Sequence, residues 1–272
     1  LVGSEMCIRD SMNTDNPYNN PYTPQAEMTP NMPGPMHGGQ DGPIRKVTIR
    51  PMELLSRSKE LIGNQYGLFL GITLVGLLIG SMVPFGLVMG PMLIGIYLCF
   101  LHRQAGRQVE FGTLFKGFDQ FGEGLIAYLI MVVFSIVTSM VTFGLFLVLG
   151  FAAMALIVGT MEGEAAAGVG VIVLIVGYLA FFLVLMVVSV LINLPFVFAF
   201  QLIADRKLSG TEAIRQSWTG AKLNFGGIVW YMLVNYFLLI LAMFACYIPA
   251  ILLMPVSMGG LFLLYSDIYR GE

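Results

Sequence analysis

Long apolar runs separated by short polar segments dominate the chain after its first 50 residues. Six runs are long enough to cross the about 30 Å hydrocarbon core of a bilayer as helices. They cover residues 67–83, 86–101, 124–149, 169–201, 226–246 and 249–268. Residues 125–160 carry no charge, so we expect one tilted helix there that continues into a small outer element. The pattern predicts an all-α polytopic membrane protein with six transmembrane helices.

Basic residues fall in alternate connections between these runs. They precede the first run and follow the second, fourth and sixth: Arg45, Lys46, Arg50, Arg57, Lys59; Arg103, Arg107, Lys116; Arg206, Lys207, Arg215, Lys222; Arg270. The opposite connections hold only Glu162 and Glu164 and neutral turns. Because short loops rich in Lys and Arg stay in the cytoplasm, we expect both termini to be cytoplasmic.

Two segments, Pro91–Gly122 and Pro195–Gly226, share the same order of features. Each starts with a proline in an apolar helix and ends in Phe-Gly. Between the proline and the Phe-Gly come a basic pair and then a glycine, at the same spacing in both segments. A third amphipathic start, Glu53–Gly67, aligns with Glu212–Gly226. Repetition at fixed spacing indicates repeated units, with chance agreement as the alternative. We therefore expect three helical hairpins, each preceded by a cytoplasmic amphipathic helix and related as parallel repeats; hairpins 52–101 and 211–268 should superpose.

The amphipathic segment FGTLFKGFDQFG illustrates these starts. Phe111, Leu114, Phe115, Phe118 and Phe121 fall at helical spacing on one face, with Lys116, Asp119 and Gln120 off it. Such a helix is typical of the headgroup plane of a membrane. Basic side chains at that level attract anionic lipids. The lipid bilayer, with anionic lipids at the amphipathic helices, is thus the expected partner, and a groove for a partner protein is the alternative.

Composition supports a membrane protein. Hydrophobic residues make up 57% of the chain, charged residues 11%, and the mean hydropathy is +0.82, against about 25% charged residues in soluble domains. The net charge is −2 and no basic tract is interleaved with aromatics, so we expect no nucleic-acid partner.

The chain divides into three parts. Residues 1–11, LVGSEMCIRDS, look like the translation of a sequencing adapter, which places the expected native start at Met12. Residues 12–51 are expected to form a disordered tail, because Asn13–Pro43 is rich in Pro, Asn, Met and Gly. Residues 52–272 form the six-span domain. Outside the first part, Cys99 and Cys246 fall near opposite ends of two spans, so we expect no disulfide.

Few residues within the spans offer chemistry. No Asp, Glu, Lys or Arg lies in the middle of a span, which argues against proton relays, ion-coupled pumps and voltage sensing. The deepest polar residues are Asn193 and Asn235, together with Ser135, Thr138, Ser139 and Thr142. The two asparagines either line a substrate path beside carbonyls freed by Pro195 or form interhelical hydrogen bonds, and we favour the second.

Other residue patterns predict packing and the absence of catalysis. Gly67 and Gly71, Gly76 and Gly80, and Gly86 and Gly90 lie four apart, as at helix contacts. His102 beside Arg103 is expected at a helix end, where a cation stabilises the negative end of the helix dipole. The sequence has no metal-ligand cluster, no phosphate-binding Gly loop and no nucleophile motif. We therefore expect no enzyme, no cofactor and no metal site.

The order of features resembles a superfamily of bacterial six-span proteins. Two stretches are similar to the YciC-like proteins and to the membrane domain of some glycerophosphoryl diester phosphodiesterases. They are GPMLIGIYLCFLHRQAGR with EFGTLFKGFDQF (90–121), and LPFVFAFQLIADRKLSG through EAIRQSWTGAKLNFGG (194–227). The chain lacks the phosphodiesterase domain, so that activity does not follow. The resemblance implies a multi-pass protein of the bacterial cytoplasmic membrane. We expect a scaffold or lipid-associated envelope factor, with a membrane-protein partner or a second copy; the alternative is a small-solute or lipid transporter.

Overall fold

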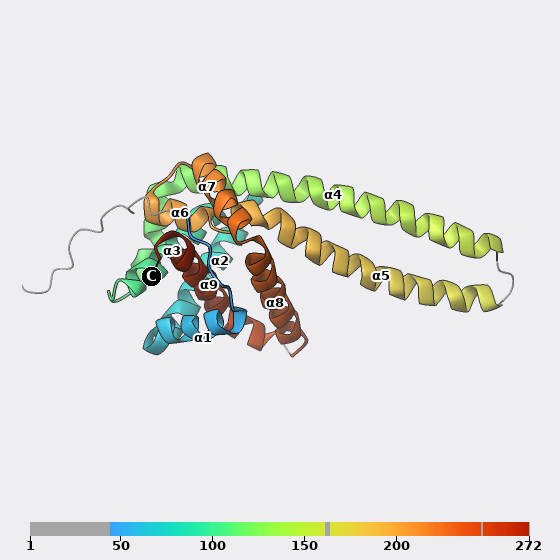
Figure 1. The fold of residues 1–272 in the computed structure, drawn as a ribbon, viewed down its shortest axis with the longest axis horizontal. Helices are drawn as coiled ribbons and strands as arrows, with labels where there is room; N and C mark the ends of the chain where they lie inside the picture. The colour runs from blue at the N-terminus through green and yellow to red at the C-terminus, as the bar shows by residue number, and fades with distance from the viewer. Residues whose placement is uncertain (1–43, 161–163, 246, 272) are drawn as a thin grey trace, which may run out of the picture. The chain divides into compact units, whose positions relative to one another are not determined.

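The computed structural model describes residues 44–160, 164–245 and 247–271, and this part of the chain is all-helical, as predicted (Figure 1). Five stretches are long and apolar enough to cross a membrane: Pro51–Met82, Phe111–Leu156, Gly168–Arg206, Phe225–Phe244 and Ile248–Tyr269. The predicted span 86–101 corresponds to α3 (Met89–Gln104), which has 16 residues. It rises about 24 Å, less than the about 30 Å of hydrocarbon. Five candidate spans are therefore present, and the sixth stays a prediction.

The first five elements form a bent start and a helical hairpin. They are α1 (Pro51–Ile62), η1 (Gly63–Gln65) and α2 (Tyr66–Met82), followed by η2 (Pro84–Gly86) and α3. Pro51 lies in the first turn of α1, where its missing N–H costs no helical hydrogen bond. Gly63 ends α1 with a φ of 46°, a conformation that favours glycine.

The second group begins with η3 (Phe111–Gln120), a 3₁₀ helix that leads into α4 (Phe121–Thr160). The prediction of one apolar face is wrong in part, because Leu114 is buried while the four phenylalanines are 38–44% exposed. Small residues, Thr113 and Gly117, are buried beside Leu114 instead. The expected outer element beyond the third run is also absent, because α4 is one continuous helix of 40 residues.

A proline divides the fourth apolar run. The run forms α5 (Glu164–Asn193), η4 (Leu194–Phe196) and α6 (Ala199–Arg206). The α-helix ends at Asn193 because Pro195 has no N–H to continue it. Figure 1 shows α4 and α5 side by side as two long antiparallel helices.

The last group comprises α7 (Gly210–Leu223), α8 (Phe225–Phe244) and α9 (Ile248–Tyr269). Pro255 remains inside α9, whereas Pro91 lies in the first turn of α3. α7 packs its small residues, Ala213, Ser217 and Ala221, against η4 and α6. Phe198 donates its backbone N–H to the Ser217 hydroxyl at 3.0 Å, which fixes this contact.

The helix α3 lies at the centre of the core. Ten of its 16 residues are buried, and it contacts α1, α2, η3, α4, α6 and α9. The approach is closest at glycines: Gly90 lies against the Gly124 backbone, Gly95 against the Leu114 carbonyl and Gly117 against the Pro91 carbonyl. Of the predicted glycine pairs, those at 76 and 80 and at 86 and 90 face neighbours, whereas Gly67 and Gly71 have nothing within 4 Å of the position that a Cβ would take.

The segment 44–50, inside the predicted tail, is extended and held by hydrogen bonds. Arg45 N–H donates to the Ile268 carbonyl at 3.0 Å, and Val47 N–H donates to Asn224 Oδ1 at 2.9 Å. Asn224 Nδ2 returns a bond to the Arg45 carbonyl at 2.9 Å. The predicted adapter, the rest of the tail, Glu162 and Cys246 lie outside the described residues.

Candidate functional site

The two predicted polar residues, Asn193 and Asn235, line different hollows. Asn235 lies on α8 and faces a cavity bounded by α2, α3, α8 and α9. Asn193 lies at the end of α5 and faces a smaller hollow between α5 and α4. The structure therefore does not bring the two asparagines into one site.

The cavity at Asn235, here called the α8–α9 cavity, has a volume of about 280 Å³. Its apolar lining comes from leucines and methionines of α2, α8 and α9. Its polar lining consists of uncharged residues: Tyr97, Tyr231, Asn235, Tyr236 and Ser257. An apolar hollow with a few convergent polar groups is the usual form of a small-ligand site.

Two residues that line this cavity each have a polar atom without a hydrogen-bond partner in the structure. These atoms are Asn235 Oδ1 and Ser257 Oγ, and both are shielded from solvent. Ser257 is only 7% exposed. An unpaired buried polar atom costs about 1–3 kcal/mol, so such atoms are uncommon unless something binds them. Sequence reasoning found Asn235 by its polarity but missed Ser257, which carries no motif and differs from a packing serine only in its surroundings.

Side-chain hydroxyls fix the cavity wall formed by α9. Tyr231 donates to the Ser257 carbonyl at 3.0 Å from α8. Ser58 donates to the Val256 carbonyl at 2.8 Å from α1, and Tyr66 donates to the Leu252 carbonyl at 2.5 Å from the start of α2. Because three elements hold this stretch of α9, the Ser257 hydroxyl is kept at a defined position.

The hollow at Asn193 has a volume of about 60 Å³ and brings together the polar residues predicted on the third and fourth runs, except Thr138. Ser135, Ser139 and Thr142 line it from α4, and Ser189 and Asn193 line it from α5. Asn193 Nδ2 donates to the Ser189 carbonyl of its own helix at 2.7 Å. This bond satisfies the amide within α5 rather than across the interface.

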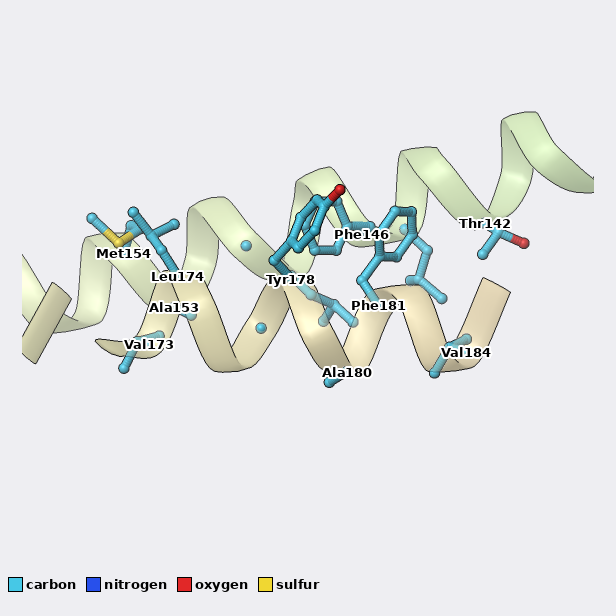
Figure 2. Close-up of a pocket in the computed structure, with 14 residues that line it drawn as sticks. Thr142, Phe146, Ala153, Met154, Val173, Leu174, Tyr178, Ala180, Phe181 and Val184 are labelled. Carbon is cyan, nitrogen blue, oxygen red and sulfur yellow. The ribbon is translucent and has the colours of Figure 1, made fainter. Parts of the chain in front are cut away.

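A third hollow is a groove of about 320 Å³ between α4 and α5, and its lining is almost entirely carbon. Phe146 and Phe181 stack across it with ring centroids 3.9 Å apart. Figure 2 shows these rings and Tyr178 lying between the two helices, with Thr142 at one end. The groove offers a hydrocarbon surface and little to orient a polar ligand.

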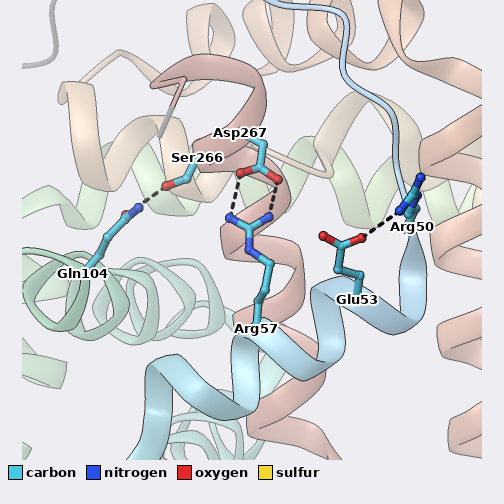
Figure 3. Close-up of polar contacts among 6 residues, drawn as sticks. All are labelled: Arg50, Glu53, Arg57, Gln104, Ser266 and Asp267. Carbon is cyan, nitrogen blue, oxygen red and sulfur yellow. Dashed lines mark hydrogen bonds and ion pairs between the residues drawn. The ribbon is translucent and has the colours of Figure 1, made fainter.

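Charged residues gather at the C-terminal end of α9, outside all three hollows. Arg57 forms two bonds with the Asp267 carboxylate, at 2.9 and 3.1 Å, and Ser266 donates to Gln104 Oε1 at 2.9 Å (Figure 3). Tyr265 donates to Asp205 at 2.7 Å. These bonds join α9 to α1, α3 and α6, so we assign the cluster to packing.

The structure places His102 and Arg103 in the last turn of α3, the helix end at which the sequence predicted them. Burial lowers the pKa of His102, and the nearby charges of Lys116 and Arg107 lower it further. Arg103 also reaches a second helix end: its Nε donates to the Leu61 carbonyl at 2.8 Å, in the last turn of α1. The Arg103 cation thus lies in the last turn of α3 and also bonds to the C-terminal end of α1.

Within the described part of the chain, no group of three or more His, Cys, Asp or Glu side chains could hold a metal ion. The α8–α9 cavity is lined by two residues with unpaired buried atoms, Asn235 and Ser257, and these atoms can donate or accept hydrogen bonds. No protein-family model, curated protein or solved structure matches this chain.

Proposed function

We propose that the chain is a lipid-associated, non-enzymatic protein of a bacterial cytoplasmic membrane, with six crossings and both termini in the cytoplasm. The observation that carries this proposal is the unburied apolar surface of α4 and α5. The most apolar 18-residue stretch of each contains no buried residue. A surface of this kind is stable only against hydrocarbon or another apolar surface.

The exposed phenylalanines of η3 support contact with the membrane interface. Phe111 and Phe115 form one ring pair and Phe118 and Phe121 another, with centroids 6.1 and 6.2 Å apart. Lys116 lies on the same short element and is exposed. Aromatic rings next to a basic side chain are typical of a segment at the headgroup level of an anionic leaflet.

Matching burial supports the proposed parallel repeat and, with it, the resemblance to the six-span superfamily. Thr113 and Ser217 hold equivalent positions in the two aligned segments, and both are buried. Gly117 and Ala221 are a second equivalent pair, and both are buried. In each segment a small residue thus faces the preceding apolar helix, which is what a common origin of the two units would produce.

Cysteine labelling tests the proposed topology. In a variant with all native cysteines replaced by serine, Gln108→Cys follows α3 and Thr219→Cys lies on α7; both positions are exposed. If α3 crosses the membrane, both react with an impermeant maleimide only from the cytoplasmic side. Labelling of Gln108→Cys from the outside would contradict six crossings.

Lipid analysis tests the proposed association. Extraction of the full-length protein in polymer-bounded native discs should enrich anionic phospholipid over the bulk membrane. The Lys116→Gln variant should reduce that enrichment. Lys59→Gln, an exposed basic residue on α1, is the matched control for loss of one charge. Lipid identical to the bulk membrane, with no reproducible protein partner, would contradict the proposal.

Transport is the second candidate, and the polar hollow between α4 and α5 favours it. Serine and threonine hydroxyls that face Asn193 are the kind of lining that a solute path needs. Flux in proteoliposomes that is lost on Asn193→Leu would establish transport, and the scaffold role would then be wrong.

A further inference from the structure

We propose that the α8–α9 cavity binds the head of an uncharged, hydroxyl-bearing lipid. The inference rests on the proposed lipid association and names the class of lipid that this site selects. It is carried by two unpaired buried atoms, Asn235 Oδ1 and Ser257 Oγ, whose residues line the same hollow.

The hydrogen-bonding capacity of the two atoms defines the head. Asn235 Oδ1 is an acceptor only, whereas a serine hydroxyl both donates and accepts. A ligand must therefore present at least one donor to Asn235, and a second polar atom of either kind satisfies Ser257. An alcohol hydroxyl can meet either need, because it both donates and accepts hydrogen bonds.

The absence of charge around the cavity excludes ionic heads. None of the residues that line it is an Asp, Glu, Lys, Arg or His. A phosphate or carboxylate head would lie against the Asn235 acceptor with no cation to offset its burial, and an ammonium head would find no anion. Unpaired charges in such surroundings are strongly disfavoured.

The volume sets where the rest of the lipid lies. A cavity of about 280 Å³ holds a polar head and a few carbons but no complete acyl chain. Leu77, Leu239 and Met254 line the cavity and are partly exposed. They provide an apolar rim across which a chain can continue into the bilayer.

Photo-crosslinking tests the site with a defined probe. The full-length protein in detergent is incubated with a long-chain alcohol that carries a diazirine, and crosslinked peptides are mapped by mass spectrometry. Crosslinks should map to α8 and α9. The unlabelled alcohol should compete at least ten-fold better than the fatty acid of the same length or phosphatidic acid.

Two variants probe the polar atoms. Asn235→Leu and Ser257→Ala should each lower crosslinking by about ten-fold, which corresponds to about 1.4 kcal/mol. Thr138→Val is the control, since Thr138 bonds to the Phe134 carbonyl of its own helix and lines none of the three hollows. The two site variants should melt at or above the wild-type temperature, because each removes an unpaired buried atom. Ser257→Ala is the milder change and keeps the test decisive if Asn235→Leu does not fold.

Three outcomes would overturn the inference. The first is crosslinking at the wild-type level in both folded variants, and the second is equal competition by an anionic lipid. The third is no crosslink in the cavity, which would mean that water alone satisfies the two atoms. The lipid association itself would still stand if native discs retained their enrichment in anionic lipid and Lys116→Gln reduced it. Failure of this inference is therefore distinguishable from failure of the proposed function.

Discussion

The close approach of α3 to η3 gives the sharpest test of the fold. Gly95 leaves no room for a side chain, because an added Cβ would overlap the Leu114 carbonyl oxygen. Gly71, on α2, has nothing within 4 Å of that position. Gly95→Ala and Gly71→Ala are therefore the same chemical change in an occupied and in an open environment.

The magnitude follows from the atoms that must move. The obstacle at Gly95 is backbone, which cannot rotate away as a side chain would, so α3 and η3 must separate. A gap of about 1 Å forfeits up to half of the attraction of each atom pair across the contact. Overpacking of this kind costs about 1–3 kcal/mol, and we expect the upper end, reduced by the about 1 kcal/mol that Ala gains over Gly in a helix. The net loss is about 2 kcal/mol at Gly95, against a gain of up to about 1 kcal/mol at Gly71.

Cys99 provides the assay, because it is fully buried on α3. With Cys7 and Cys246 replaced by serine, it is the only thiol in the chain. A thiol-reactive dye then reports the unfolding of α3 during a thermal scan in detergent. Gly95→Ala should melt several degrees below the parent, and Gly71→Ala at or above it. The same melting temperature for both variants would refute the close contact between α3 and η3.

Two further predictions concern pH and the N-terminal segment. Because the pKa of His102 is lowered in the folded state by burial and by Lys116 and Arg107, the unfolded state binds more protons below about pH 6.5. The melting temperature, followed by tryptophan fluorescence, should fall from pH 7 to pH 5, and His102→Gln should reduce this fall; an unchanged pH dependence would contradict the role of His102. Asn224→Ala removes both bonds that Asn224 makes to segment 44–50, at a cost of about 1–3 kcal/mol. Trypsin should then cleave after Lys46 faster than in the wild type, and an unchanged rate would mean that other contacts hold the segment.

The positions of the long helices could be predicted because apolar length is visible in a sequence. The run 67–83 became α2 (Tyr66–Met82), and the run 226–246 became α8 (Phe225–Phe244). Aromatic-glycine junctions mark both starts, as expected. The break at Pro195 shows the limit of this approach, since hydropathy continues through a residue that ends an α-helix.

The inward faces were harder to predict than the helices. In η3 the phenylalanines looked like one apolar face, but the buried face contains Thr113 and Gly117 as well as Leu114. Close helix contact inside a membrane protein is made by small residues, whose burial leaves no trace in hydropathy. The same reason hid Ser257, since a serine in a membrane helix is equally compatible with packing and with a ligand site.

The difference between six predicted crossings and five candidate spans has a physical origin in α3. A helix that faces lipid must match the hydrocarbon thickness, because its backbone and side chains meet the bilayer directly. α3 instead contacts six other elements and buries most of its residues. Its ends can therefore lie in protein or in polar surroundings within the membrane, where a shorter helix is tolerated. Helix length alone therefore does not show whether α3 crosses the membrane. The side of the membrane on which Gln108 lies decides between the two topologies.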